Sequence, residues 1–332
     1  MTGTLLDKRK SLIIKGWGIL LMLTHHLFYS KWSQAYYDDI VVHGIALVNQ
    51  LGIFSKLCVA IFVFASGYGL TVSTPKDMKL KDFYWYRFRK LYLNYWFVWL
   101  LFVPIGIVVF GRTFTNAYGD HAAIKGVLDL FGMLSMFGID SYNPTWWFYS
   151  CILILYLLFP LINKFLWRTP YFVLSVALSI GMFAFIPGIN VIASYLFVFL
   201  TGMVLARMPL DWINNTKWWQ IAIALMLLAV WRMSQLSPKH IADAMLCAGM
   251  AFLINKLAFD NWIGNVLAEL GKHSMNMFLI HTFIFYFWFT DYIYITRNPL
   301  LILLSLVVPS FLCSVFIERI KNEIGFYKLL KR

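Results

Sequence analysis

Long apolar segments decide what this chain can fold into. A transmembrane helix needs about 20 mainly apolar residues. We interpret ten stretches as such spans, namely 12–30, 51–73, 91–111, 146–164, 169–187, 191–206, 217–235, 241–259, 273–290 and 299–317. Hydrophobic residues make up 61% of the 332-residue chain and charged residues only 13%, against about 25% charged residues in soluble proteins. We therefore expect an all-α polytopic membrane protein with about ten transmembrane helices, and we exclude a soluble nucleotide-binding fold.

Basic residues predict the side of the membrane on which each loop lies. The chain has 28 Lys and Arg against 15 Asp and Glu, which gives a net charge of +13. If the N-terminus is cytoplasmic, the ten expected spans place 21 basic residues inside and six outside, with Lys56 within a span. Cytoplasmic loops are enriched in Lys and Arg, so we expect both termini in the cytoplasm and the spans in the inner (plasma) membrane. This interpretation assigns the basic surplus to topology and lipid contact, and not to nucleic acid.

One segment resists the simple alternation of spans and loops. Residues 122–138 are apolar but short, and they include Lys125 and Asp129. Counting them as a span would reverse the side of every later loop and remove the charge bias. We therefore expect 112–145 to be an external loop that contains a short interfacial or re-entrant helix. Residues 1–332 as a whole are expected to form a single membrane-embedded domain.

Ionisable side chains within spans are candidate functional residues, because a bilayer makes them costly. In the first span, Lys15 and His26 are 11 residues apart. On an α-helix this spacing puts them within about 20° of the same face and about 16 Å apart along the axis. His25 points about 100° away from His26, so we favour His26. The alternative is that Lys15 extends to the interface and His26 bonds a neighbouring carbonyl.

A basic pair follows the second span. Arg87 and Lys90 are three residues apart and therefore neighbours on one helical face. With Lys15 they would form a cytoplasmic basic mouth for a phosphorylated ligand, since Arg and Lys bind phosphate; the alternative is an interfacial anchor. Within the second span, Ser66 and Gly67 allow close approach, either by another helix or by a narrow ligand.

The ninth span adds a second intramembrane histidine. Ser274 lies near its expected cytoplasmic start, and His281 lies seven residues, or two turns, further along. Catalysis, pocket lining and a structural role are all compatible with His281. Trp146 and Trp147 open the fourth span, where an outer aromatic belt is expected. The four cysteines lie in apolar runs without metal-binding spacing, and there is no Walker-type loop, GxSxG elbow or HExxH motif, so we expect no metal.

These features, in this order, resemble the acyltransferase-3 family of integral membrane acyltransferases. The resemblance extends from about residue 9 to residue 290 as scattered motifs. The family's basic residue, ten intervening residues and histidine correspond to Lys15 and His26, with Lys in place of Arg. The other corresponding residues are Phe64, Ser66 and Gly67 in the second helix, Arg87 and Lys90 before the third, Trp147–Phe148 with Tyr156 and Pro160 in the fourth, and Gly271, Ser274 and His281 near the end. Lys is not equivalent to Arg at a bidentate phosphate site. Thr145 stands where many members have a histidine, and we assign it no role.

The resemblance implies a membrane O-acyltransferase. It would move an acyl group, usually acetyl, from cytoplasmic acyl-CoA to a hydroxyl of a cell-envelope polysaccharide or a lipid-linked sugar. His26 would be the general base for the acceptor hydroxyl, a role that suits imidazole because its unperturbed pKa is about 6.5. The alternatives are a polytopic transporter or exporter of a glycan or small molecule, and a structural or sensory membrane protein that keeps the fold without the chemistry.

The same resemblance implies roles for the remaining candidates. Catalytic or oxyanion support is implied for His281, Ser66 and His25. Binding of acyl-CoA, the co-substrate, is implied for Lys15, Arg87 and Lys90. Pocket lining is implied for Gly67, Trp147 and Ser274.

Overall fold

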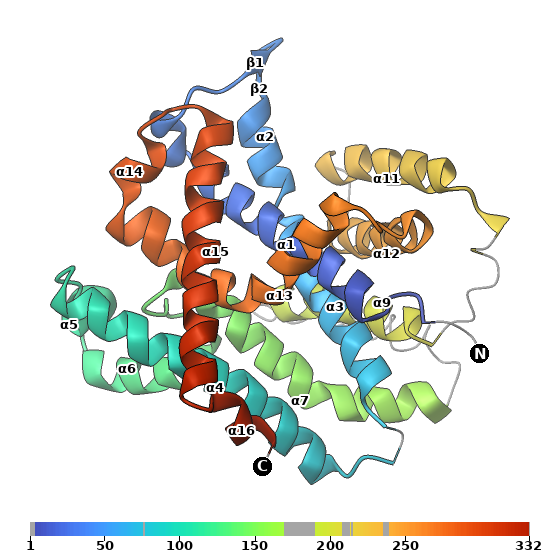
Figure 1. Ribbon diagram of the computed structural model, residues 1–332, viewed down its shortest axis with the longest axis horizontal. Helices are drawn as coiled ribbons and strands as arrows, with labels where there is room; N and C mark the ends of the chain where they lie inside the picture. The colour runs from blue at the N-terminus through green and yellow to red at the C-terminus, as the bar shows by residue number, and fades with distance from the viewer. Residues whose placement is uncertain are drawn as a thin grey trace. The chain divides into compact units, whose positions relative to one another are not determined.

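The computed structural model describes residues 4–75, 77–168, 190–207, 213, 215–234 and 239–331. Most of these residues are helical. The strands among them are β1 (Val41–Val42) and β2 (Ile45–Ala46), which pair as a short antiparallel hairpin (Figure 1).

The helices follow one another in a simple order along the chain. The α-helices are α1 (Lys8–Phe28), α2 (Leu47–Phe54), α3 (Leu57–Ser73), α4 (Leu80–Val108), α5 (Phe114–Tyr118), α6 (Ala122–Leu130), α7 (Trp147–Arg168), α9 (Asn190–Leu205), α11 (Trp218–Met233), α12 (Lys239–Leu257), α13 (Trp262–Thr282), α14 (Thr290–Tyr294), α15 (Pro299–Glu323) and α16 (Phe326–Lys331). The short 3-10 segments among the described residues are η1 (Ser33–Tyr36), η2 (Leu134–Phe137) and η3 (Pro144–Trp146), and η4 (Phe283–Trp288) is a π-helix.

Six helical segments of the described chain are long and apolar enough to cross a membrane. They are Lys8–Phe28, Leu47–Ser73, Leu80–Val108, Pro144–Lys164, Lys239–Leu257 and Pro299–Glu323. The chain is therefore a helical membrane protein, as its composition predicts. The count of ten spans and the cytoplasmic position of the termini stay predictions, and the expected span 169–187 lies outside the described residues.

Several helix boundaries differ from those expected. Helix α4 begins at Leu80 instead of residue 91, because its polar first turns are held by tertiary contacts such as the Tyr84 hydroxyl, which donates to the Leu157 carbonyl at 2.8 Å. Helix α13 begins at Trp262 instead of residue 273, and the Arg9 side chain donates to Asn265 in its first turn at 2.7 Å. Polar residues that look like loops in the sequence thus extend helices.

The described chain divides into two compact units. The first unit comprises Met1–Met22, Phe54–Met78 and Leu158–Ser274, and the second comprises Leu23–Ile53, Lys79–Leu157 and Met275–Arg332. In the first unit, α3 packs on α9, and α12 packs on α3, α9 and α11 (Figure 1).

Glycines allow two helices of the first unit to come very close. A Cβ atom at Gly16 would lie 2.0 Å from the carbonyl oxygen of Leu267, and one at Gly271 would lie 1.9 Å from that of Leu12. The backbones of α1 and α13 therefore meet at these positions, as small residues allow in membrane helices. This crossing requires the absence of a side chain at both glycines.

We expect Gly271→Ala to lower the stability of the protein by about 1–3 kcal/mol, because the added methyl group would force α13 away from the Leu12 carbonyl. The measurement is the thermal unfolding midpoint of the full chain in detergent. Gly69→Ala is the matched control, since a Cβ atom there meets nothing within 4 Å and alanine favours a helix. A Gly271→Ala protein as stable as the unmodified chain would contradict the close crossing.

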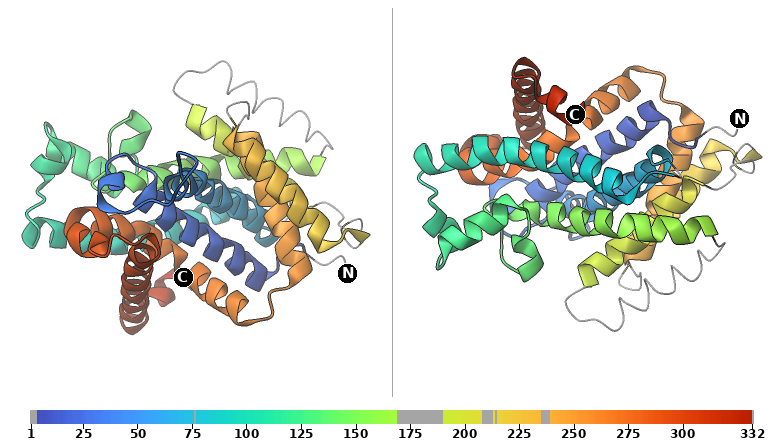
Figure 2. Two further views of the ribbon diagram at one scale, coloured as in Figure 1. Left: turned by 90° about the horizontal axis from the view of Figure 1, so that it is seen from above. Right: turned by 90° about the horizontal axis from the view of Figure 1, so that it is seen from below.

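In the second unit, α4 and the first part of α7 run side by side (Figure 2, teal and green in the right-hand view). The Tyr95 and Tyr149 rings stack between them with centroids 4.3 Å apart. Helix α15 packs on α14, η4 and α16.

The segment between α4 and α7 is organised around a buried carboxyl group. Asp129, on α6, is fully buried. Its side chain accepts hydrogen bonds from the Tyr118 hydroxyl at 2.6 Å and the Tyr142 backbone N–H at 2.9 Å, and its carbonyl accepts one from the Tyr95 hydroxyl at 2.7 Å. Burial raises the pKa of Asp129, although these two side-chain hydrogen bonds oppose the shift. The expected outer position of this short helix stays a prediction.

We expect Asp129→Asn to become more stable relative to the unmodified chain as the pH rises. The ordinary pKa of an aspartate is 3.8. Because the folded state raises the pKa of Asp129, the protonated carboxyl stabilises the folded protein. This stabilisation is complete below pH 3.8 and is lost as the pH rises through the folded pKa. Asparagine keeps an oxygen for both donors and carries no charge. The measurement is the difference in thermal unfolding midpoint between the two proteins at pH 4 and pH 8. A variant that loses relative stability at pH 8 would refute a raised pKa.

Candidate functional site

The candidate site lies in the second unit, where the end of α1 meets the end of α13. The His26 and His281 ring centroids are 5.0 Å apart. His26 is half-buried, whereas His281 is completely buried. The Phe285 ring stacks on His281 and lies 6.3 Å from His26. The structure thus brings together two histidines that are 255 residues apart in the sequence.

His25 has different surroundings from His26. Its ring is buried and stacks on Tyr29, and its Nδ1 lies 2.8 Å from the carbonyl oxygen of Gly52 in α2. A carbonyl only accepts hydrogen bonds, so His25 Nδ1 carries a hydrogen and donates it. This bond ties the end of α1 to α2. Asn49 adds to the tie, because its side-chain N–H donates to the Phe28 carbonyl at 2.8 Å.

The tautomer of neutral His281 follows from its partners. Its Nδ1 lies 2.8 Å from the Phe278 carbonyl oxygen, so Nδ1 is the donor. In the neutral ring, Nε2 is then an acceptor, and the Thr282 hydroxyl lies 3.2 Å from it. Both ring nitrogens are therefore bonded to the chain itself, and His281 meets His26 through its ring.

Thr145, to which we assigned no role from the sequence, extends this polar cluster. Its Oγ1 lies 3.3 Å from Thr282 Oγ1 and 2.8 Å from Asn143 Oδ1. Trp146 is almost fully buried beside it, and its indole N–H donates to the Leu279 carbonyl at 3.1 Å. The sequence feature that could have identified Thr145 as a site residue is its motif position, two residues before the Trp147–Phe148 pair. Trp147 itself is half-buried.

A change of helix type follows His281 directly. Helix α13 ends at Thr282, and the π-helix η4 continues from Phe283 to Trp288. Single π turns inside helices often occur at functional sites. Within η4, Trp288 stacks on Phe102 and Phe110 of the α4 region, with interplanar angles of 1° and 5°.

The predicted basic residues fall into both units. Lys15 is half-buried in the first unit, on helix α1, which also carries His26. The face that they were expected to share stays a prediction. Arg87 and Lys90 lie on α4 in the second unit. The Arg87 guanidinium lies over the Tyr86 ring, 5.3 Å from its centroid, and Lys90 is exposed. A common phosphate-binding mouth of the three stays a prediction.

The remaining predicted residues lie in the first unit. Ser66 is half-buried in α3, and Ser274 is buried and donates to the Gly271 carbonyl at 2.8 Å. A Cβ atom at Gly67 would lie 2.2 Å from the Phe199 carbonyl oxygen, so this glycine lets α9 pack closely on α3. The roles of these residues in ligand binding stay predictions.

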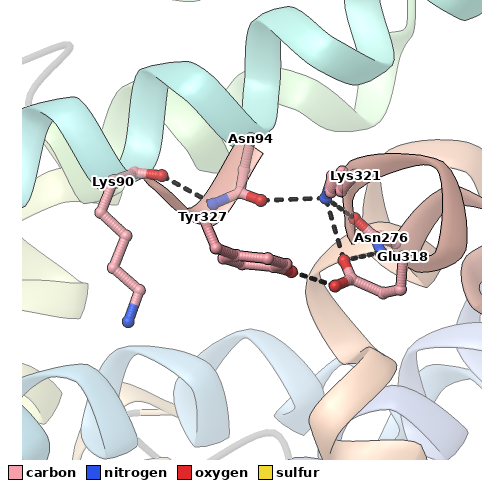
Figure 3. A network of polar contacts seen from close by, with 6 residues as sticks. All are labelled: Lys90, Asn94, Asn276, Glu318, Lys321 and Tyr327. Atoms are coloured by element: carbon pink, nitrogen blue, oxygen red, sulfur yellow. Dashed lines mark hydrogen bonds and ion pairs between the residues drawn. The ribbon is translucent and has the colours of Figure 1, made fainter. Parts of the chain in front are cut away.

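A buried lysine ties four helices of the second unit together beside Lys90. Lys321 on α15 is completely buried, and its ammonium donates to Asn94 of α4 at 2.9 Å, Asn276 of α13 at 2.9 Å and Glu318 at 3.0 Å. The Glu318 carboxylate also accepts from the Asn276 amide and from the Tyr327 hydroxyl of α16. In Figure 3 the ammonium group of Lys90 points away from this network, while its carbonyl accepts from the Asn94 amide at 2.7 Å.

Among the described residues, no group of three or more His, Cys, Asp or Glu side chains is placed to hold a metal ion.

Comparison with known proteins identifies the family. No curated protein and no solved structure matches the chain. A family model described as an acyltransferase domain, that of the acyltransferase-3 family, matches residues 12–319, nearly the whole chain. The chain belongs to the acyltransferase-3 family and is a membrane acyltransferase.

Proposed function

We propose that the protein is an O-acyltransferase that uses cytoplasmic acyl-CoA, with acetyl as the acyl group, and an acceptor hydroxyl on a cell-envelope glycan or lipid-linked sugar. The observation that carries this proposal is the position of His26, half-buried and in ring contact with His281, on the helix that also carries Lys15. Family membership supports the reaction class.

In this proposal His26 is the general base. Its imidazole takes the proton of the acceptor hydroxyl while the hydroxyl oxygen attacks the thioester carbonyl. A carbon–oxygen bond forms, the carbon–sulfur bond breaks, and the CoA thiolate leaves and recovers the proton from His26. A role of Lys15, Arg87 and Lys90 in binding the phosphates of the donor stays a prediction.

The other candidates take supporting roles. His25 is bonded to the Gly52 carbonyl, which favours His26 as the base. His281 supports His26 through ring contact, because both of its ring nitrogens already have partners in the chain. Oxyanion support by Ser66, and pocket lining by Gly67, Trp147 and Ser274, stay predictions.

The test compares the cell-envelope glycans of cells with and without this protein by mass spectrometry. We expect acyl esters on a glycan only when the protein is present. Purified protein in lipid vesicles should then transfer radiolabelled acetyl from acetyl-CoA to that glycan. Glycan movement across the vesicle membrane without any acyl donor, and no ester formed with one, would refute the proposal in favour of a transporter.

A further inference from the structure

We infer that Thr282, Thr145 and Asn143 form a hydrogen-bonded chain that lets His281 take up a proton without movement of any heavy atom. Thr145 is then a positioning residue for the His26–His281 pair. The part that concerns catalysis rests on the proposed function, whereas the hydrogen-bonded chain follows from the contacts alone.

The two ends of this chain are fixed by backbone carbonyls. At one end, the Phe278 carbonyl accepts from His281 Nδ1, so that nitrogen keeps its hydrogen whatever the charge of the ring. At the other end, the Asn143 amide donates to the Leu279 carbonyl at 3.3 Å. Asn143 must therefore present its Oδ1, an acceptor, to the hydroxyl and the backbone N–H of Thr145, at 2.8 Å and 3.1 Å.

Between these ends the hydroxyl hydrogens have two complete arrangements. With neutral His281, the Thr282 hydroxyl donates to Nε2 and the Thr145 hydroxyl donates to Thr282 Oγ1, while the Thr145 backbone N–H still serves Asn143. When a proton binds Nε2, each direction reverses. Nε2 then donates to Thr282, Thr282 donates to Thr145, and Thr145 donates to Asn143 Oδ1. In both arrangements, each hydroxyl hydrogen of Thr282 and Thr145 has an acceptor.

Burial makes the completeness of this chain important. His281 and Asn143 are 0% exposed, Thr282 4% and Thr145 7%. A buried donor without an acceptor is costly, so the reversal can occur only while Thr145 offers its oxygen to Thr282. The hydroxyl of Thr145 is thus what permits a charge on His281.

A proton on His281 acts on His26, because their rings are in contact. The titratable groups that face His281 from α1 are His26, at 5.0 Å between centroids, and His25. Thr145 from η3 and Phe285 from η4 carry no charge. Two such close imidazoles titrate as a pair. The hydrogen-bonded chain of Thr282, Thr145 and Asn143 therefore helps to set the pH at which His26 can accept a proton.

The experiment measures the proton on His281 directly, by nitrogen NMR of the full-length protein in detergent with ¹⁵N-labelled histidine rings. His281→Gln identifies the signal. We expect neutral His281 to carry its hydrogen on Nδ1. We also expect Thr145→Val, which keeps the shape but has no hydroxyl, to move the titration of His281 about one pH unit lower, because the charged arrangement leaves the Thr282 hydroxyl without an acceptor. Thr145→Ser keeps the hydroxyl and should titrate like the unmodified chain.

An equal titration of His281 in Thr145→Val and in the unmodified chain would overturn the inference, and so would a neutral ring with its hydrogen on Nε2. If Thr145→Val does not fold, Thr145→Cys provides the same comparison with a weakly bonding group and should shift in the same direction. The acidic limb of acetyl transfer against pH is measured on the same proteins, and it should move with the NMR titration. If Thr145→Val shifts the titration of His281 but none of these proteins, the unmodified chain included, transfers acetyl, the proposed function is refuted and the hydrogen-bonded chain is not.

Discussion

Replacing His26 by glutamine should lower kcat/KM for acetyl transfer by about 10²- to 10⁴-fold, the usual contribution of a positioned general base. Glutamine fills a similar volume and forms hydrogen bonds, but it cannot take a proton from the acceptor. The half-buried position of His26 leaves part of its ring accessible, so we expect the variant to fold. The measurement is the rate of radiolabelled acetyl transfer by purified protein in lipid vesicles.

Two further histidine variants separate catalysis from stability. His43→Gln changes an exposed histidine between the hairpin strands, and it should keep the full rate. His25→Gln removes the imidazole that bonds Gly52, and it should mainly lower the thermal unfolding midpoint. If His26→Gln keeps the full rate, or if His25→Gln alone abolishes transfer in a folded protein, His26 is not the base.

Lys321→Met should cost about 3–5 kcal/mol of stability, because it removes the fully buried partner of an ion pair whose carboxylate is itself half-buried. The side-chain oxygens of Asn94 and Asn276 would lose their ammonium donor, and Glu318 would keep its charge without the opposite one. We expect a large drop in the thermal unfolding midpoint in detergent and little folded protein at 37 °C.

The double variant Lys321→Met with Glu318→Gln tests the cause. It should recover part of the loss, because it removes both charges and leaves a neutral acceptor for the Tyr327 hydroxyl. Lys328→Met, at an exposed lysine of α16, is the matched control and should behave like the unmodified chain. A Lys321→Met protein of ordinary stability would show that the buried network does not hold these helices together.

The sequence was sufficient to predict what depends on one helix at a time. The apolar stretches predicted a helical membrane protein, and the 11-residue spacing placed Lys15 and His26 on the helix that α1 now forms. The motifs also indicated the family, which the match over residues 12–319 confirms. Periodicity and motif order are local properties, and a single sequence displays them directly.

What the sequence could not predict depends on contacts between distant segments. Thr145 and Thr282 are 137 residues apart, and no pattern in either segment predicts their contact. The motif directed attention to Trp147, whereas the neighbouring Trp146 is the ring that is buried against α13. The early start of α4 had the same cause, since its polar first turns depend on a bond to α7.

The π-helix η4 makes the length of its segment as important as its composition. A π turn holds one residue more than an α turn, and one residue corresponds to about 100° of rotation about the helix axis. Winding the same residues as an α-helix would therefore turn the rest of the segment by about that amount. Trp288 would then leave the Phe102 and Phe110 rings on which it stacks, even if every aromatic side chain were kept. The number of residues in η4 is therefore expected to matter for this stacking as much as the identity of its aromatic side chains.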